Sequence, residues 1–185
     1  MTERKLIAIS GSIQVGKSTL IRKLLDASDL PVCGFMTKLA REDKVPGKGW
    51  PLYIYPAALA EKDRVKSPAN LLGYPGPGDP ARFRDVFDGI AYSFLEDIPE
   101  DAIVVMDELG NMETSSEKFM NRVFEVIHGK NPVILAIKAR FEFPFLARLR
   151  SEAGGNYYWI TEENRDRIAQ ELIPVVRGWN RTDRE

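Results

Sequence analysis

The chain has 185 residues, of which 44% are hydrophobic and 29% charged, as in an ordinary globular domain and unlike a disordered or collagen-like chain. Its 26 basic and 27 acidic side chains leave a net charge of -1, which argues against general binding to nucleic acid or to an anionic membrane surface. A single cysteine excludes an intrachain disulfide, and no apolar stretch is long enough to span a bilayer, so we expect a cytoplasmic protein.

Short apolar runs alternate with helical periodicities along the chain, which is typical of α/β proteins with a mostly parallel sheet. We expect strands at 6–10, 32–39 and 51–55, and a helix that begins near Gly16 between the first two. Residues 44–49 contain one proline and two glycines and predict a turn. This turn would make the third strand antiparallel to the second, and we expect the third strand at an edge of the sheet, where proline is tolerated.

The segment 57–78 contains three prolines and three glycines. A structureless loop of this length is unusual in a compact domain unless it has a function, so residues 57–79 are a candidate lid or substrate loop. A helix should follow this segment, because Asp79 can cap it and Pro80 suits its first position.

The second half of the chain predicts three strands, at 102–106, 132–137 and 157–160, with helices between and after them. Thr114 and Glu117 form a capping-box pattern ahead of a helix that ends at Gly129; residues 145–151 are helical, and Thr161 caps the last helix. We expect one three-layer α/β/α domain over residues 1–176, followed by a polar C-terminal tail at 177–185.

A glycine-rich stretch lies between the first predicted strand and the first helix and matches the P-loop (Walker A) pattern G-x-x-x-x-G-K-[ST]. Its backbone N–H groups would surround a β-phosphate, Lys17 would reach the β- and γ-phosphate oxygens, and the Ser18 hydroxyl would coordinate Mg²⁺. Thr19 is placed to contact the α-phosphate. The expected nucleotide-binding residues are Gly11, Ser12, Ile13, Gln14, Val15, Gly16, Lys17, Ser18 and Thr19.

Two carboxylates follow the apolar run 103–106, in the Walker B arrangement. Ligands of open α/β sheets bind at the carboxyl ends of the strands, so this pair should face the P-loop. Asp107 then fits a ligand of Mg²⁺, and Glu108 could accept a proton from a water aligned on the γ-phosphate. Lys138 and Arg140 follow another strand to the same edge and are candidates for a second cation at the γ-phosphate.

Four stretches resemble, in order along the chain, the signatures of one known family. They are Gly11–Leu20, Gly34–Thr37, Met106–Glu113 and Thr161–Asp166. The family is that of the small P-loop nucleoside-triphosphatases first known from thermophiles, which also includes the cancer-related nucleoside-triphosphatase of humans. The resemblance extends from about Leu6 to Ile173.

The resemblance implies a RecA-like sheet with an extra strand between the P-loop strand and the acidic strand. It also implies hydrolysis of ATP, GTP and other nucleoside triphosphates to the diphosphate and phosphate, with Lys17, Ser18, Asp107 and Glu108 in the roles given above. The chain departs from the family pattern at Lys38, where an acidic residue is usual, in segment 45–50 and at Lys138. The chain therefore resembles a divergent member of this family.

Two other functions fit the motifs. A P-loop kinase would pass the γ-phosphoryl group to a small-molecule or nucleotide acceptor, which segment 57–78 could hold. A nucleotide-gated switch would bind a nucleotide tightly and turn it over slowly. Glu108 directly after Asp107 favours water as the acceptor, and hence a hydrolase.

Overall fold

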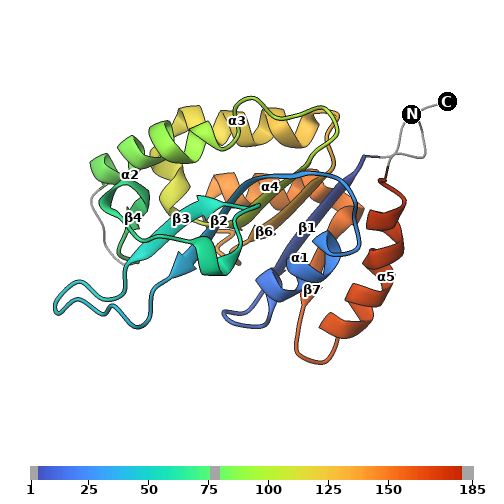
Figure 1. Ribbon diagram of the computed structural model, residues 1–185, viewed down its shortest axis with the longest axis horizontal. Coiled ribbons are helices and arrows are strands. Elements are labelled where there is room, and N and C mark those ends of the chain that lie inside the picture. Colours follow the sequence, from blue (N-terminus) through green and yellow to red (C-terminus); the bar gives the residue numbers. More distant parts are fainter. Residues whose placement is uncertain (1–3, 76–79, 181–185) are drawn as a thin grey trace.

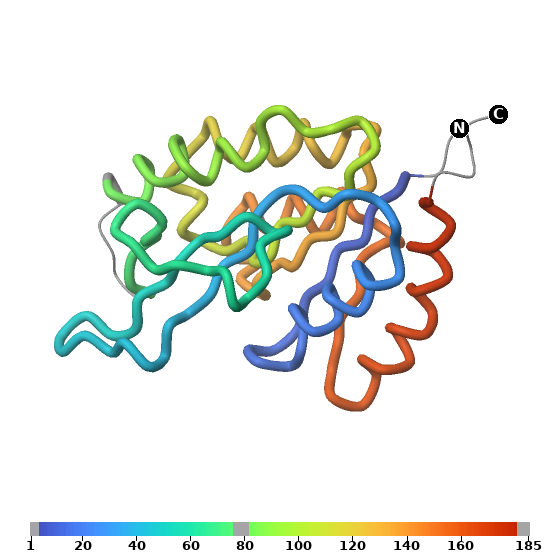
Figure 2. Tube along the Cα trace, in the orientation of Figure 1, coloured from blue at the N-terminus to red at the C-terminus, as the bar shows by residue number. Residues whose placement is uncertain are grey.

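The computed structural model describes residues 4–75 and 80–180. Seven strands form one sheet in the order β4-β3-β2-β5-β6-β1-β7 (Figures 1 and 2). The pairs that involve β3 are antiparallel, and the other pairs are parallel. The strands are β1 (Leu6–Gly11), β2 (Val32–Leu39), β3 (Leu52–Pro56), β4 (Leu71–Gly73), β5 (Ile103–Leu109), β6 (Val133–Ile137) and β7 (Tyr157–Ile160).

Helices cover both faces of the sheet and confirm the predicted three-layer α/β/α architecture. One face carries α1 and α5, and the other carries α2, α3 and α4 (Figure 1). Their bounds are α1 (Lys17–Leu25), α2 (Pro80–Val86), α3 (Glu117–His128), α4 (Pro144–Ala153) and α5 (Arg165–Arg177). None of the helices in the described part of the chain is long and apolar enough to cross a membrane.

The strand order places the functional motifs next to one another. β6 lies between β1, which leads into the P-loop, and β5, which ends in the acidic pair. This is the extra strand that the family resemblance implies. Because β1, β5 and β6 are parallel, their carboxyl ends meet at one edge of the sheet.

The approach of β2 to β5 requires glycine at one position. Gly34 has φ 89°, and a Cβ atom there would lie 2.1 Å from the carbonyl oxygen of Val105. A side chain would therefore be strained by its backbone conformation and would also collide with β5. Gly34 lets β2 run close beside the strand that carries the acidic pair.

The predicted edge position of β3 is wrong. Leu52 pairs with Gly73 and Tyr53 with Leu71, so β4 lies outside β3 and forms the edge. β4 is part of the segment expected to be a loop, which also contains two short 3₁₀ helices, η1 (Glu61–Asp63) and η2 (Pro68–Asn70). Leu72 is fully buried, which explains why the chain returns to the sheet at this point. Asp79, the predicted helix cap, lies outside the described residues.

Two predicted helix caps are also wrong. The hydroxyl of Ser116, not that of Thr114, caps α3 and accepts a hydrogen bond from the Phe119 N–H at 3.0 Å. Residues Met112–Ser115 form the 3₁₀ helix η4 instead. α5 begins only at Arg165, because Thr161 makes a closed turn in which its N–H donates to the Asn164 side chain at 2.8 Å.

One residue of the predicted polar tail belongs to the core. Trp179 follows α5 and is buried in the apolar cluster that α1 and α5 form against the sheet. Its ring removes apolar surface from water, and the core therefore extends beyond residue 176.

Candidate active site

The P-loop connects β1 to α1, as its pattern requires. Gly16 occupies the N-cap of α1 with φ 106°, a conformation that few other residues adopt. The ammonium group of Lys17 turns back over the loop and donates to the carbonyl oxygens of Gly11 at 3.3 Å and Ser12 at 3.0 Å. Lys17 is buried, whereas Ile13 at the tip of the loop is 86% exposed. The loop thus presents a buried positive charge at the N-terminus of a helix, which is a site for an anion.

Glu108 connects two lysines. Its Oε1 lies 3.4 Å from the Nζ atom of Lys17, and its Oε2 lies 3.8 Å from the Nζ atom of Lys138. The carboxylate and both ammonium groups therefore meet at the ends of β1, β5 and β6. The predicted residues Lys17, Glu108 and Lys138 come together in this way.

A β-bulge lets Glu108 share this site with Asp107. On β6, Ala136 pairs with Asp107 and Ile137 pairs with Leu109, so Glu108 has no partner in the ladder. A bulge redirects the side chain that it leaves unpaired. Both consecutive carboxylates can then face the P-loop, which a regular strand with alternating side chains would prevent.

Asp107 is 2% exposed and accepts a hydrogen bond from the Ser18 side chain. Burial raises the pKa of Asp107 to about 6, and the Ser18 hydrogen bond and the positive charges of Lys17 and Arg64 oppose this shift. A carboxylate and a hydroxyl are oxygen ligands of the kind that Mg²⁺ prefers, and Mg²⁺ sites in proteins often contain only one or two carboxylates. Ser18 and Asp107 therefore fit a magnesium site.

A second buried acid, Glu113, supports the turn after β5. Its Oε2 accepts a hydrogen bond of 2.9 Å from the N–H of Gly110, and burial raises its pKa to about 7. Lys138 packs against the same turn, since a Cβ atom at Gly110 would lie 2.9 Å from its Cδ. The Lys138 N–H also donates to the carbonyl oxygen of Leu109 at 2.8 Å. Lys138 and the acidic pair are thus positioned by one connected turn.

The structure does not bring Arg140 to this group. Its guanidinium forms an ion pair with Glu142 and lies 5.2 Å from the centre of the Phe143 ring. The Arg140 side chain is 53% exposed. These contacts are those of a surface residue, so Lys138 is the better placed of the two predicted cations.

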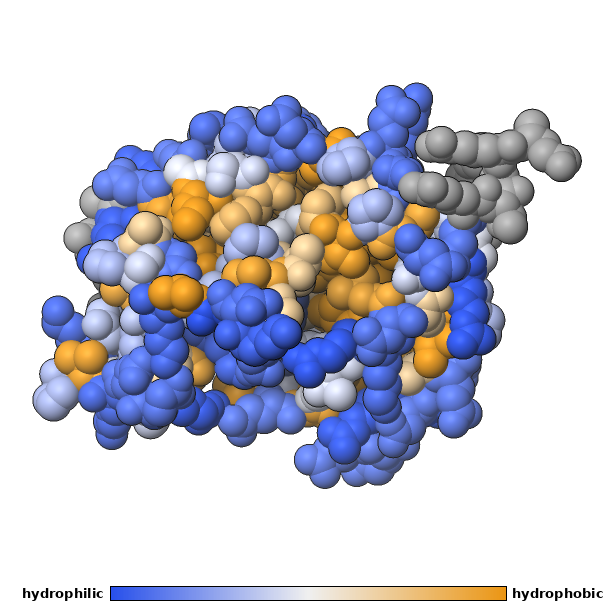
Figure 3. Space-filling model, in the orientation of Figure 1, coloured by the Kyte–Doolittle hydropathy of each residue, from blue (hydrophilic) through white to orange (hydrophobic). Residues whose placement is uncertain are grey.

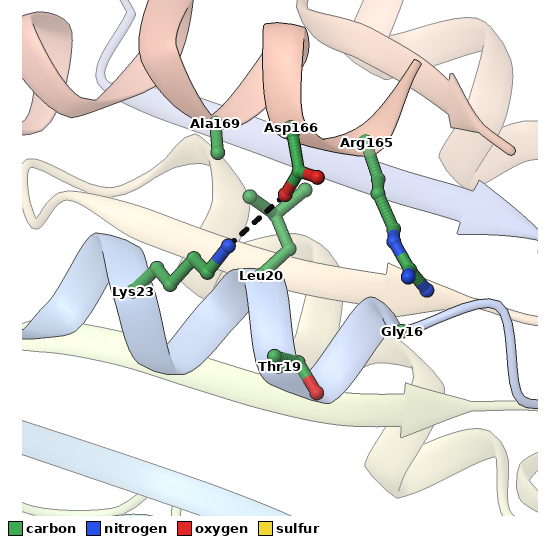
Figure 4. Close-up of a pocket in the computed structure, with 7 residues that line it drawn as sticks. All are labelled: Gly16, Thr19, Leu20, Lys23, Arg165, Asp166 and Ala169. Atoms are coloured by element: carbon green, nitrogen blue, oxygen red, sulfur yellow. Dashed lines mark hydrogen bonds and ion pairs between the residues drawn. The ribbon is translucent and has the colours of Figure 1, made fainter. Parts of the chain in front are cut away.

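A pocket of about 220 Å³ adjoins the P-loop between α1 and α5 (Figure 4). Thr19, Gly16 and Arg165 line it next to the P-loop, and Lys23 pairs with Asp166 at 3.1 Å. Arg165 also donates a hydrogen bond of 3.0 Å to the carbonyl oxygen of Val15. The last helix is therefore attached directly to the phosphate-binding loop.

Sequence reasoning did not single out three residues of this region. Glu113 and Arg165 lie within stretches that resemble the family signatures. This resemblance is the feature of the sequence that points to them. Arg64 lies in the segment that reads as a loop, and its sequence neighbours carry no motif that points to it. Its charge is near enough to Asp107 to lower the pKa of that carboxyl group.

Comparison with known proteins places the chain in one group. A family model described as NTPase matches residues 6–173. The nucleoside-triphosphatase THEP1 of Archaeoglobus fulgidus is 30% identical over an alignment of 177 positions that covers 93% of this chain and 99% of that protein. The crystal structure of THEP1 from Aquifex aeolicus shares the fold, with a TM-score of 0.61 and 23% identity over 92% of this chain and 98% of that one. The solution structure of a human cancer-related nucleoside triphosphatase also shares it, with a TM-score of 0.60 and 22% identity over 97% and 98% of the two chains.

Proposed function

The chain belongs to the NTPase family and is a nucleoside-triphosphatase, and we propose that it is a Mg²⁺-dependent enzyme in which Glu108 activates the attacking water. The substrates are ATP, GTP and related nucleoside triphosphates, and the products are the diphosphate and phosphate. The observation that carries the proposal is the position of the Glu108 carboxylate, 3.4 Å from the Lys17 ammonium and 3.8 Å from that of Lys138.

In this mechanism Glu108 accepts a proton from a water molecule, and the water oxygen attacks the γ-phosphorus. The bond from that phosphorus to the bridging oxygen breaks, and the diphosphate leaves with the electron pair. Lys17 and Lys138 stabilise the negative charge on the phosphoryl oxygens. Ser18 and Asp107 would hold Mg²⁺, which neutralises phosphate charge when it is bound.

The pocket between α1 and α5 suits the rest of the nucleotide. Thr19 is on the side of the P-loop where the α-phosphate would lie, and the pocket continues from it toward Arg165 and Asp166. A chain of phosphates on the P-loop would therefore direct the ribose and base into this pocket. Its polar groups could donate and accept hydrogen bonds to a sugar or a base.

Phosphate release from ATP and GTP with Mg²⁺ tests the proposal, with no other acceptor present. We expect Glu108→Gln to bind nucleotide like the wild type and to release phosphate about 10²-fold more slowly, the scale for a positioned base. Glu96→Gln is the matched control, because Glu96 is exposed and lies in the turn before β5.

Normal phosphate release by Glu108→Gln would show that another group activates the water. A wild-type protein that binds nucleotide but releases phosphate only when a small-molecule acceptor is added would be a kinase. Both outcomes contradict the proposal.

A further inference from the structure

Three residues on neighbouring strands form a row across one face of the sheet. Tyr55 on β3 pairs with Met36 on β2, and Met36 pairs with Asp107 on β5. Side chains at paired positions project from the same face of a sheet. Tyr55 and Asp107 therefore face the same side, two strand spacings apart, which is roughly 10 Å.

The Arg64 side chain lies over Tyr55, at the end of this row that is farther from Asp107. Its guanidinium carbon lies 5.8 Å from the centre of the Tyr55 ring, and its Nε and Nη2 donate to the Leu59 carbonyl oxygen at 3.2 and 3.1 Å. These contacts fix the guanidinium above the same face of the sheet as Asp107. Its remaining nitrogen, Nη1, has no hydrogen-bond partner among the described residues.

Arg64 differs from the other charged residues of its segment. Glu61, Lys62 and Lys66 are exposed, whereas Arg64 is partly buried. Within residues 4–75 and 80–180, no carboxylate lies at ion-pair distance from its guanidinium. The Leu59 carbonyl oxygen and the Tyr55 ring are its partners, and neither carries a negative charge, so an anionic ligand would stabilise the guanidinium further.

The segment that carries Arg64 is fixed on the side of the site away from the P-loop. Glu61 forms an ion pair of 3.1 Å with Lys38, which lies two residues after Met36 on β2 and therefore projects from the same face of the sheet. The segment therefore lies over the same face as α1, and Figure 3 shows a hollow in this face that is lined by hydrophobic residues and has hydrophilic residues along its lower border.

We propose that Arg64 is a catalytic residue whose guanidinium contacts the γ-phosphoryl group during hydrolysis, on the side opposite the P-loop. This inference rests on the proposed function. Lys17 follows β1 and Lys138 follows β6, and both contact the same phosphoryl group. Arg64 is the third cation at this group and reaches it from the other side of β5. Arg64 takes no part in proton transfer, since Glu108 accepts the proton of the water.

The planar guanidinium suits this position. Its N–H groups lie in one plane and can bind two phosphoryl oxygens in a fixed planar geometry, whereas the three N–H groups of an ammonium impose no such plane. Negative charge on these oxygens is redistributed in the transition state, and a positioned arginine then stabilises the transition state more than the bound substrate. Arg64 should therefore act on kcat more than on KM.

Steady-state kinetics of Arg64→Ala and Arg64→Lys test the inference. We expect kcat to fall about 10²-fold or more in both variants, with KM within a few-fold of the wild-type value. Lys62→Ala is the matched control, since Lys62 is an exposed cation of the same turn and should leave both constants unchanged. Binding of a fluorescent nucleotide analogue should be equal in all four proteins.

Chemical rescue separates a missing charge from a distorted site. We expect guanidinium chloride at low concentration to increase kcat of Arg64→Ala, and sodium chloride at equal ionic strength to have no effect. Neither salt should rescue Glu108→Gln. If Arg64→Ala melts at a lower temperature than the wild type, Arg64→Lys, whose methylene stem can still lie over Tyr55, is the variant that decides.

Wild-type kcat in either folded variant would overturn this inference, as would a loss of kcat in Arg64→Ala that guanidinium does not rescue. The proposed function is tested separately by phosphate release from the wild type and Glu108→Gln. If these two behave as expected while Arg64→Lys hydrolyses at the wild-type rate, the inference about Arg64 fails and the proposed function stands.

Discussion

Arg165 illustrates how a single side chain can connect a helix to the nucleotide site. Its guanidinium donates to the Val15 carbonyl oxygen at 3.0 Å, and a Cβ atom at Gly16 would lie 3.3 Å from its Nη1. The side chain therefore supports the P-loop from outside, on the wall of the pocket proposed for the ribose and base. We predict that its role is to position the loop.

Removing this contact should weaken nucleotide binding. We expect Arg165→Ala to raise KM about tenfold, because a hydrogen bond from a charged donor contributes about 1.5–3 kcal/mol, and to change kcat much less. Arg167→Ala is the matched control, since Arg167 pairs on the surface with Glu171. The measurement is steady-state phosphate release over a range of ATP concentrations, and equal KM values for the two variants would contradict this role.

At this scale the sequence points to residues whose chemistry depends on their immediate sequence neighbours. Lys17 and Ser18 follow from the P-loop pattern, and Asp107 and Glu108 from their place at the end of an apolar strand. Arg64 could not be predicted, because its position depends on the pairing of Tyr55 with Met36 and of Met36 with Asp107, which are distant in the sequence.

Among the elements, the short helix η4 carries a buried acid that makes stability depend on pH. Burial raises the pKa of Glu113 to about 7 from an ordinary value of 4.5. Between these pH values the folded state holds a proton that the unfolded state releases, so the stabilisation is complete below about pH 4.5 and is lost as pH rises through 7.

Glu113→Gln should remove this pH dependence, since the amide oxygen can still accept from Gly110 and carries no charge. We expect the variant to match the wild type at pH 5 and to exceed its free energy of unfolding at pH 8 by about 2 kcal/mol. Urea unfolding at the two pH values measures the difference, with Glu96→Gln as the exposed control. Identical pH profiles for the wild type and Glu113→Gln would show that Glu113 does not titrate in this range.

Element boundaries show where periodicity is insufficient. Thr114, Ser115 and Ser116 are all hydroxyl residues ahead of α3, and each could cap it. Ser116 is the cap because its hydroxyl also contacts Asp88, on the helical segment after α2. β4 was not predicted for a similar reason, since three residues form a strand only when β3 is already beside them.

Across the whole molecule, the proposed nucleotide contacts join parts that are distant in the sequence. They include the loop after β1, the ends of β5 and β6, and α5 through Arg165. A ligand held by all of these parts binds the folded chain and not the unfolded one. Nucleotide should therefore stabilise the fold by mass action.

We expect Mg²⁺ with ADP at about 100 times its dissociation constant to stabilise the folded state by about 2.7 kcal/mol, which raises the melting temperature by about 5–10 °C for a chain of this size. Lys17→Ala should abolish the shift, whereas the exposed Lys130→Ala should retain it. Differential scanning fluorimetry measures both. A full shift in Lys17→Ala would place the nucleotide elsewhere on the protein.

The strand order also affects how the molecule behaves beside its own copies. The edges of the sheet are β4, with three residues, and β7, with four, whereas the longer strands β1, β2 and β5 lie inside. An exposed edge offers unpaired backbone groups on which a strand from another chain can add. With such short edges, little backbone is open to this addition, so the fold itself opposes aggregation through its sheet in a crowded solution.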